Sequence, residues 1–171
     1  MKTSFTHAKA ALAGQTLIVA EHKKAKAPKH LKGKDARAFV KGAEIYNREA
    51  HCGTCHQPNG QGLPDAGFPP LAATKWATGN PDRLIKLSLK GLMGPIEVKG
   101  KTYPGVVPMT PFEALLSDEE LAAVLTYVRN SFGNKASVIQ PSHVKQVRES
   151  SKSVAPMIQP AKLLEEYPLE K

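Results

Sequence analysis

Apolar residues recur at helical spacing in three stretches of this 171-residue chain. The first begins with Asp35, a residue type that caps helix N-termini. It contains Gly42, which predicts that another element approaches closely there. The second begins with Asn80, an N-cap followed by proline, and should stop at Gly91. Both stretches are therefore predicted to be helices.

The third helix has the strongest start signal in the chain. Ser117 and Glu120 stand at the spacing of a capping box, and Gly133 supplies a stop. Its predicted apolar face consists of Leu121, Val124, Leu125, Val128 and Phe132. Between the second and third helices, residues 96–103 alternate apolar and polar around a Lys-Gly pair, which predicts a small hairpin. Together these patterns predict a mainly α domain that spans about residues 35–134.

The segments on either side of this domain differ from it in charge. Of the net charge of +9, residues 1–34 carry +7, residues 135–171 carry +2, and the domain is neutral. We expect residues 1–34 to be a basic leader or linker, or part of a preceding domain, with a short helix over residues 5–26. We expect residues 135–171 to be a proline-containing C-terminal extension with one short helix from Ser142.

Hydropathy and charge patterning argue against several classes of protein. No apolar run approaches the roughly 20 residues of a membrane-spanning helix. No aromatic residues are interleaved with the N-terminal lysines as binding of single-stranded nucleic acid would require. The N-terminus has no clear signal peptide, so we take Met1 to start a shortened chain or an excised domain. The basic segment could instead dock on an acidic partner or an anionic membrane surface.

Both cysteines of the chain lie in the sequence CGTCH, residues 52–56. The pattern C-x-x-C-H is typical of c-type haem attachment. Cys52 and Cys55 would each form a thioether with one vinyl group of the haem, and His56 would bind the iron from one face. The motif therefore predicts one covalently attached haem c.

Three other interpretations of these cysteines are weaker. A thioredoxin-like redox pair requires a preceding strand and a βαβ context, which the pattern lacks. A zinc site needs about four ligands, and completing it with His51 and His56 would strain the tetrahedral geometry. A disulfide across two residues would close a tiny loop and stabilise little.

The second axial ligand of the iron must come from elsewhere in the chain. Met109 lies in a loop between two prolines, and such a loop can hold a thioether at a fixed distance from the iron. Met1 is terminal, Met157 lies in the proline-containing tail, and Met93 fits a core-facing residue. His51 directly precedes the motif and cannot easily reach the opposite face. Because methionine–histidine ligation is the usual arrangement for electron transfer, Met109 is the predicted ligand.

These features together resemble a class I cytochrome c domain. The similarity rests on CGTCH after a glycine-containing helix, on GFPPLA at residues 67–72, on the loop methionine, and on a capped helix that ends in LTYVRNSFGN. It covers about residues 35–134 and implies a helical fold around one haem, in which the first and last helices cross. The residues that match this crossing are Gly42, Tyr46, Tyr127 and Val128.

The resemblance also implies roles for residues around the motif. In that family a proline carbonyl accepts the proton of the ligand histidine, and Pro69 or Pro70 matches this position. A tryptophan often lies near a haem propionate, so Trp76 is either such a residue or an ordinary core residue.

Residues 91–109, followed by LTYVRNSFGN at residues 125–134, resemble more narrowly the cytochrome domains attached to bacterial periplasmic dehydrogenases that oxidise sugars or alcohols. The resemblance implies an electron carrier, not an enzyme, that passes electrons between a dehydrogenase and a downstream acceptor such as a terminal oxidase. The alternatives are a haem enzyme or gas-binding sensor with an open iron position, and a module whose buried haem is only structural. Because thioether attachment in bacteria follows export, we expect a periplasmic or otherwise extracytoplasmic location, and a parent chain could supply a membrane tether.

Overall fold

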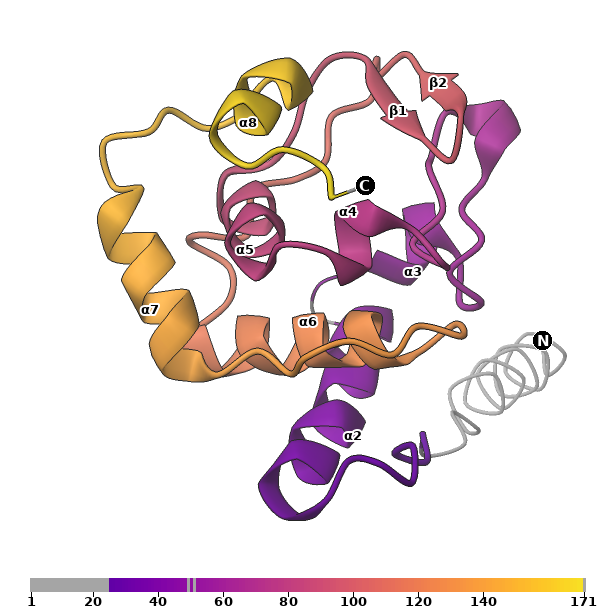
Figure 1. Cartoon of the computed structure of the whole chain (residues 1–171), viewed down its shortest axis with the longest axis vertical. Coiled ribbons are helices and arrows are strands. Elements are labelled where there is room, and N and C mark those ends of the chain that lie inside the picture. The colour runs from indigo at the N-terminus through magenta and orange to yellow at the C-terminus, as the bar shows by residue number, and fades with distance from the viewer. Residues whose placement is uncertain (1–24, 49, 51, 171) are drawn as a thin grey trace, which may run out of the picture.

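A computed structural model of the chain describes residues 25–48, 50 and 52–170 (Figure 1). In chain order its elements are α2 (Gly33–Asn47), α3 (Cys52–His56), the 3₁₀ helix η1 (Pro64–Ala66), α4 (Lys75–Thr78), α5 (Pro81–Lys90), β1 (Ile96–Val98), β2 (Lys101–Tyr103), α6 (Asp118–Asn130), α7 (Pro141–Ser150) and α8 (Pro160–Glu166). The helix predicted over residues 5–26 lies outside the described residues except for its last two, which are not helical. Among the described helices, none is both long enough and apolar enough to cross a membrane.

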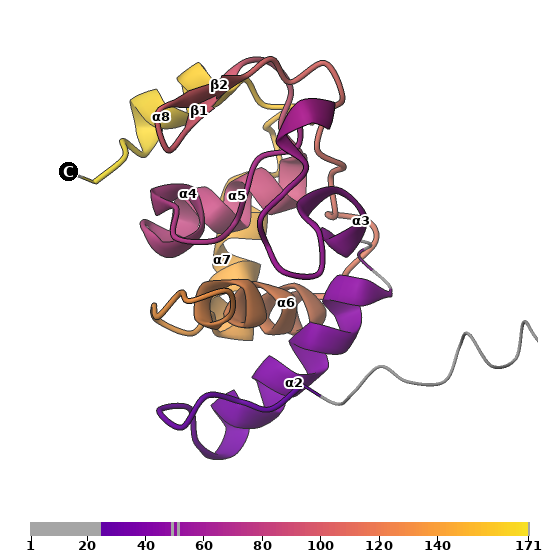
Figure 2. The same cartoon turned by 90° about the vertical axis from the view of Figure 1, so that its right-hand side faces the viewer.

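The predicted mainly helical fold with a small hairpin is confirmed. Its elements are stacked in layers that can be followed in both views. From bottom to top, α2 crosses α6, then come α5 and α4, and α8 with the hairpin forms the last layer (Figures 1 and 2). The strands β1 and β2 pair antiparallel, with Ile96 opposite Tyr103. The turn between them contains Lys99 and Gly100, both with positive φ (54° and 75°). Two such residues match the handedness of a two-residue hairpin loop.

Two of the three predicted helix starts are confirmed. The side chain of Asn80 accepts hydrogen bonds from the first backbone N–H groups of α5. At α6, Ser117 and Glu120 form both halves of the capping box. The start of α2 was predicted wrongly, because the helix begins two residues before Asp35. Gly33 has φ of 52° and starts the helix, so the carboxylate of Asp35 lies in the first turn, where it faces the positive end of the helix dipole.

The crossing of α2 and α6 is as close as Gly42 predicts. A Cβ atom added at Gly42 would lie 2.0 Å from the carbonyl oxygen of Ala123. Aromatic side chains pack beside this contact, and the ring centroids of Tyr46 and Tyr127 are 5.3 Å apart. Phe39 lies against the same Tyr127 ring at 5.1 Å. The absence of a side chain at Gly42 therefore allows the two backbones to meet.

Replacement of Gly42 by alanine is expected to lower the free energy of unfolding by about 1–3 kcal/mol, the usual cost of overpacking. The helix-propensity gain of about 1 kcal/mol offsets only part of this cost, because the backbone of Ala123 cannot move aside as a side chain could. Urea unfolding of the holoprotein measures the change. Arg37→Ala, an exposed substitution on the same helix, is the control. A Gly42→Ala protein as stable as wild type would show that the crossing can open without cost.

The C-terminal extension packs against the rest of the molecule through two helices, whereas the sequence predicted one. In α7, Val144 and Val147 are buried, and this helix begins at Pro141, one residue before the predicted start. The helix α8 was not predicted, because the prolines around it indicate irregular structure. Pro160 occupies its first turn, where proline fits a helix, and Leu163 is 1% exposed.

Candidate haem site

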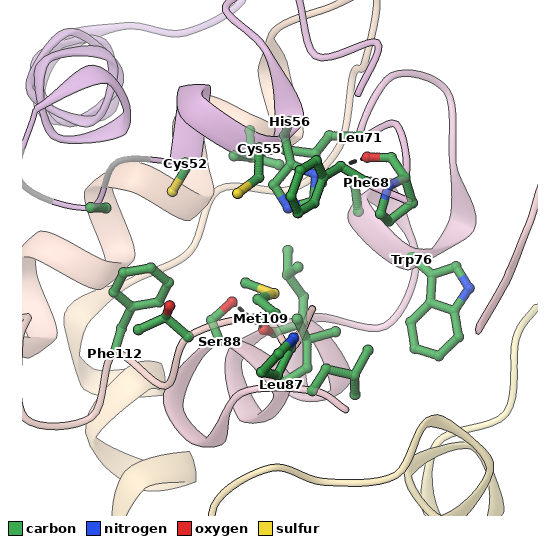
Figure 3. A pocket seen from close by; sticks show the side chains of 18 of the residues that line it. Cys52, Cys55, His56, Phe68, Leu71, Trp76, Leu87, Ser88, Met109 and Phe112 are labelled. Atoms are coloured by element: carbon green, nitrogen blue, oxygen red, sulfur yellow. Dashed lines mark hydrogen bonds between the residues drawn. The ribbon is translucent and has the colours of Figure 1, made fainter. Parts of the chain in front are cut away.

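A largely apolar cavity of about 500 Å³ lies between α3, α5, α6 and the loop of residues 104–112 (Figure 3). Its lining brings together the four residues predicted from the sequence, Cys52, Cys55, His56 and Met109. These residues come from two segments more than fifty positions apart in the chain. The fold therefore places the motif and the loop methionine on walls of one cavity.

The CGTCH motif forms the single-turn helix α3. Because residues three apart lie on one face of a helix, Cys52 and Cys55 point the same way, and Figure 3 shows their sulfur atoms and the ring of His56 directed into the cavity. Both thiols are free, so the structure gives no support to a disulfide. Among the residues that the structure describes, which exclude His51, no group of three or more His, Cys, Asp or Glu side chains is placed to hold a metal ion.

Burial favours the uncharged forms of Cys52 and His56. It raises the pKa of the Cys52 thiol to about 12, so the thiol is protonated at neutral pH. It also lowers the pKa of His56, although the hydrogen bond to Pro69 opposes the shift. A neutral imidazole is the form that binds a metal.

The ring of His56 is oriented by a backbone carbonyl. Its Nδ1 donates a hydrogen bond to the carbonyl oxygen of Pro69, at 2.8 Å (Figure 3). A carbonyl oxygen can only accept, so this bond assigns the proton to Nδ1 and leaves the lone pair on Nε2. Of the two prolines that the sequence left open, Pro69 makes the contact.

Met109 enters the cavity from the wall opposite α3 (Figure 3). Its backbone N–H donates to the carbonyl oxygen of Leu92 at 2.8 Å, and its carbonyl oxygen accepts from the N–H of Leu92 at 3.2 Å. The backbone of Met109 is therefore held on both sides of its Cα.

The other described methionines do not line this cavity. Met93 was expected to face the core, but its side chain is 42% exposed. The reason is alternation along an extended segment: Leu92 points inward and is 9% exposed, so the next side chain points outward. Met157 lies on the C-terminal extension, away from the cavity lining, and Met1 lies outside the described residues.

Trp76 forms part of the cavity wall and is 7% exposed. Its indole N–H donates to the backbone oxygen of Glu97 at 2.8 Å, which ties α4 to the hairpin. The guanidinium of Arg83 lies 5.6 Å from the centre of the indole ring. The indole N–H, which is the hydrogen-bond donor of this side chain, is thus already bonded to the hairpin. A role for Trp76 beside a haem propionate stays a prediction.

The chemistry of the lining fits a covalently attached haem. One wall carries two thiols, which could form thioethers with the haem vinyl groups, and an imidazole that could bind the iron. The other wall carries a thioether, which is also a known ligand of haem iron. Three side chains of α5 that the sequence did not predict as site residues also line the cavity: Leu84, Leu87 and Ser88. The apolar periodicity of α5 could have identified the two leucines as buried, whereas nothing in the sequence distinguishes Ser88.

Comparison with known proteins gives the same indication. Residues 39–132 match the family model described as Cytochrome c. The chain is 43% identical over 120 residues to cytochrome c-552 of Thermus thermophilus, a match that covers 67% of this chain and 76% of the relative. It is 35% identical over 115 residues to the fructose dehydrogenase cytochrome subunit of Gluconobacter japonicus, with 66% of this chain and 23% of the subunit covered. It is 32% identical over 120 residues to the cytochrome c subunit of the quinone alcohol dehydrogenase of Gluconacetobacter polyoxogenes, with 69% and 24% covered.

Proposed function

Because this chain belongs to the cytochrome c family, we propose that it carries single electrons on one haem c attached to Cys52 and Cys55, with His56 and Met109 as axial ligands. Family membership itself implies covalently bound haem c with its iron and a role in haem-based electron transfer. Beyond this, we propose the residues that bind the iron, the redox partners and the location of the protein.

One observation carries the proposed ligation: His56 and Met109 lie on opposite walls of the same cavity. Side chains so placed could both bind an iron held between them. That iron would then have no open position for a substrate or gas, which favours a carrier over an enzyme or a sensor. Histidine–methionine ligation also raises the reduction potential of the haem. A higher potential suits a protein that accepts electrons from a dehydrogenase.

The haem supplies the reversible one-electron chemistry, and the side chains of this protein hold and shield it. The Pro69 carbonyl holds the His56 ring with its Nε2 lone pair free, as such outer partners do in metal sites. Apolar side chains from α5 and α6 line the cavity and would shield the haem from water.

The cavity lining reaches the surface at Val107 and Leu115, which are 58% and 62% exposed. Electrons would enter and leave near this opening. A redox partner need bury little surface there, because weak electron-transfer encounters are small.

The proposed donor is a dehydrogenase, and the proposed acceptor is a downstream carrier or terminal oxidase. This inference rests on the relatives named as cytochrome subunits of fructose and alcohol dehydrogenases. The chain spans about a quarter of each of those subunits, so its partners are proposed from one part of them. Domains of this kind are typically periplasmic or extracellular, and we propose a periplasmic or otherwise extracytoplasmic location for this one.

A redox titration combined with exposure to carbon monoxide tests this function. We expect a reversible one-electron titration, and we expect the spectrum of the reduced protein to be unchanged by carbon monoxide, because Met109 occupies the position that the gas would need. Rapid binding of carbon monoxide by the native reduced protein would instead support the haem enzyme or gas sensor.

A further inference from the structure

The Met109 loop is connected to the C-terminal extension through residues 90–93. On one side of this segment, Leu92 exchanges both of its backbone hydrogen bonds with Met109. On the other side, Ile158 pairs with Leu92 as a parallel bridge. The N–H of Ile158 donates to Gly91 at 3.1 Å, and its carbonyl oxygen accepts from Met93 at 3.1 Å. Three chain segments therefore lie side by side in the order Met109, Leu92, Ile158.

This arrangement leaves little room for the central segment to move. Gly91 has φ of 74°, and a Cβ atom added there would lie 2.5 Å from the carbonyl oxygen of Met109. The side chains of Leu92 and Ile158 are 9% and 8% exposed, so both are packed into the core. Movement of the Met109 backbone away from the cavity would thus have to displace or break the Leu92 pairing.

The helix α8, which begins two residues after Ile158, and the segment that follows it are held against α5 by charged groups. Lys86 pairs with Glu166, and Arg83 pairs with Glu170 at 3.1 Å. The two cationic side chains are 10% and 0% exposed, whereas the carboxylates are half-exposed. A buried cation that loses its partner is strongly destabilising, so these pairs hold the extension more firmly than surface pairs would.

Apolar contacts add to this attachment. Leu163, on α8, is 1% exposed and belongs to the core cluster. Leu164 and Tyr167 pack partly buried against the same cluster. The backbone oxygen of Tyr167 also accepts a hydrogen bond from the Arg83 guanidinium at 3.2 Å.

We propose that the C-terminal extension is a positioning element for the sixth ligand of the haem iron. Glu166 and Glu170 hold α8 on α5, α8 holds Ile158 against Leu92, and Leu92 keeps the Met109 thioether in the cavity. Loosening α8 makes the Met109 sulfur easier to displace by an external ligand. The inference rests on the proposed ligation by Met109.

Imidazole binding to the oxidised full-length holoprotein tests this proposal. The test variant is Glu166→Gln with Glu170→Gln. The control, Glu149→Gln with Glu165→Gln, removes the same charge: Glu149 pairs with exposed Lys152, and Glu165 is exposed on α8. We expect the test variant to bind imidazole at least about fivefold more tightly than wild type, the low end for coupling between sites, and the control to match wild type.

Leu163→Ala provides a second route to the same effect without a change of charge. It removes the buried anchor of α8, so it should also strengthen imidazole binding, and it decides the question if the double variant fails to fold. Amide hydrogen exchange supplies a readout that does not depend on the iron. The amides of Leu92 and Met109, both bonded within the three segments, should exchange faster in both variants and not in the control.

The outcomes separate this proposal from the proposed function. If oxidised wild type shows a sulfur-to-iron absorption band and every variant binds imidazole as wild type does, the positioning role is wrong and the carrier function stands. If wild type lacks that band, Met109 is not the ligand, and the ligation and positioning proposals are both wrong.

Discussion

Met109→Ala is expected to abolish the sulfur-to-iron absorption band of the oxidised protein. Alanine has no atom that can bind iron, and its short side chain opens the wall of the cavity opposite His56. The reduced variant should then bind carbon monoxide. Its reduction potential should fall by more than about 59 mV, the shift that corresponds to a tenfold change in a one-electron equilibrium, because a thioether ligand favours the reduced state.

Met93→Ala is the matched control for this prediction. Met93 is the same residue type, lies within the segment of residues 90–93 that pairs with Met109, and is 42% exposed. Its removal should leave the band, the potential and the response to carbon monoxide unchanged. A Met109→Ala protein that keeps the band, or a Met93→Ala protein that loses it, would contradict the assignment of the ligand.

Replacement of both Cys52 and Cys55 by alanine is expected to remove covalent haem altogether. Without thioethers, the haem should dissociate when the protein is denatured, so haem staining after denaturing electrophoresis should disappear. The variant should also be much less stable. Without the haem, the largely apolar side chains around a cavity of about 500 Å³ would lose the group that they pack against.

Thr54→Ala is the control for the cysteine variant, because Thr54 lies between the two cysteines in α3 and is exposed. It should retain covalent haem and native stability. Single replacements of Cys52 or Cys55 should keep haem attached through one remaining thioether. Haem that stays attached after denaturation of the double variant would mean that another residue forms the covalent link.

The parts of the site that sequence predicted best depend on short-range patterns. The CGTCH motif needs only one helical turn to bring two sulfurs and an imidazole to one wall, so its geometry follows from its spacing. The starts of α5 and α6 depend on side chains such as Asn80 and Ser117 that bond to backbone groups two or three residues away. Such local interactions are the same in almost any fold.

The parts that sequence did not predict depend on contacts between distant segments. Pro69 and Pro70 are indistinguishable in the chain, and only the path of the loop brings one carbonyl to His56. Met93 faces outward because the preceding residue, Leu92, lies between the segments of Met109 and Ile158 and points its side chain inward. The helix α8 is stabilised by buried cations of α5, which no pattern within residues 160–166 reveals.

The most direct test of the proposed ligation is an NMR spectrum of the reduced holoprotein with isotope-labelled methionine methyl groups. The chain has four methionines. A methyl group whose sulfur binds the iron lies over the haem ring, so the ring current shifts its resonance far upfield of ordinary methionine methyls. We predict one such resonance, which disappears in Met109→Ala and persists in Met93→Ala. Four resonances in the ordinary range, or an upfield resonance that survives in Met109→Ala, would contradict ligation by Met109 and with it the closed iron site of an electron carrier.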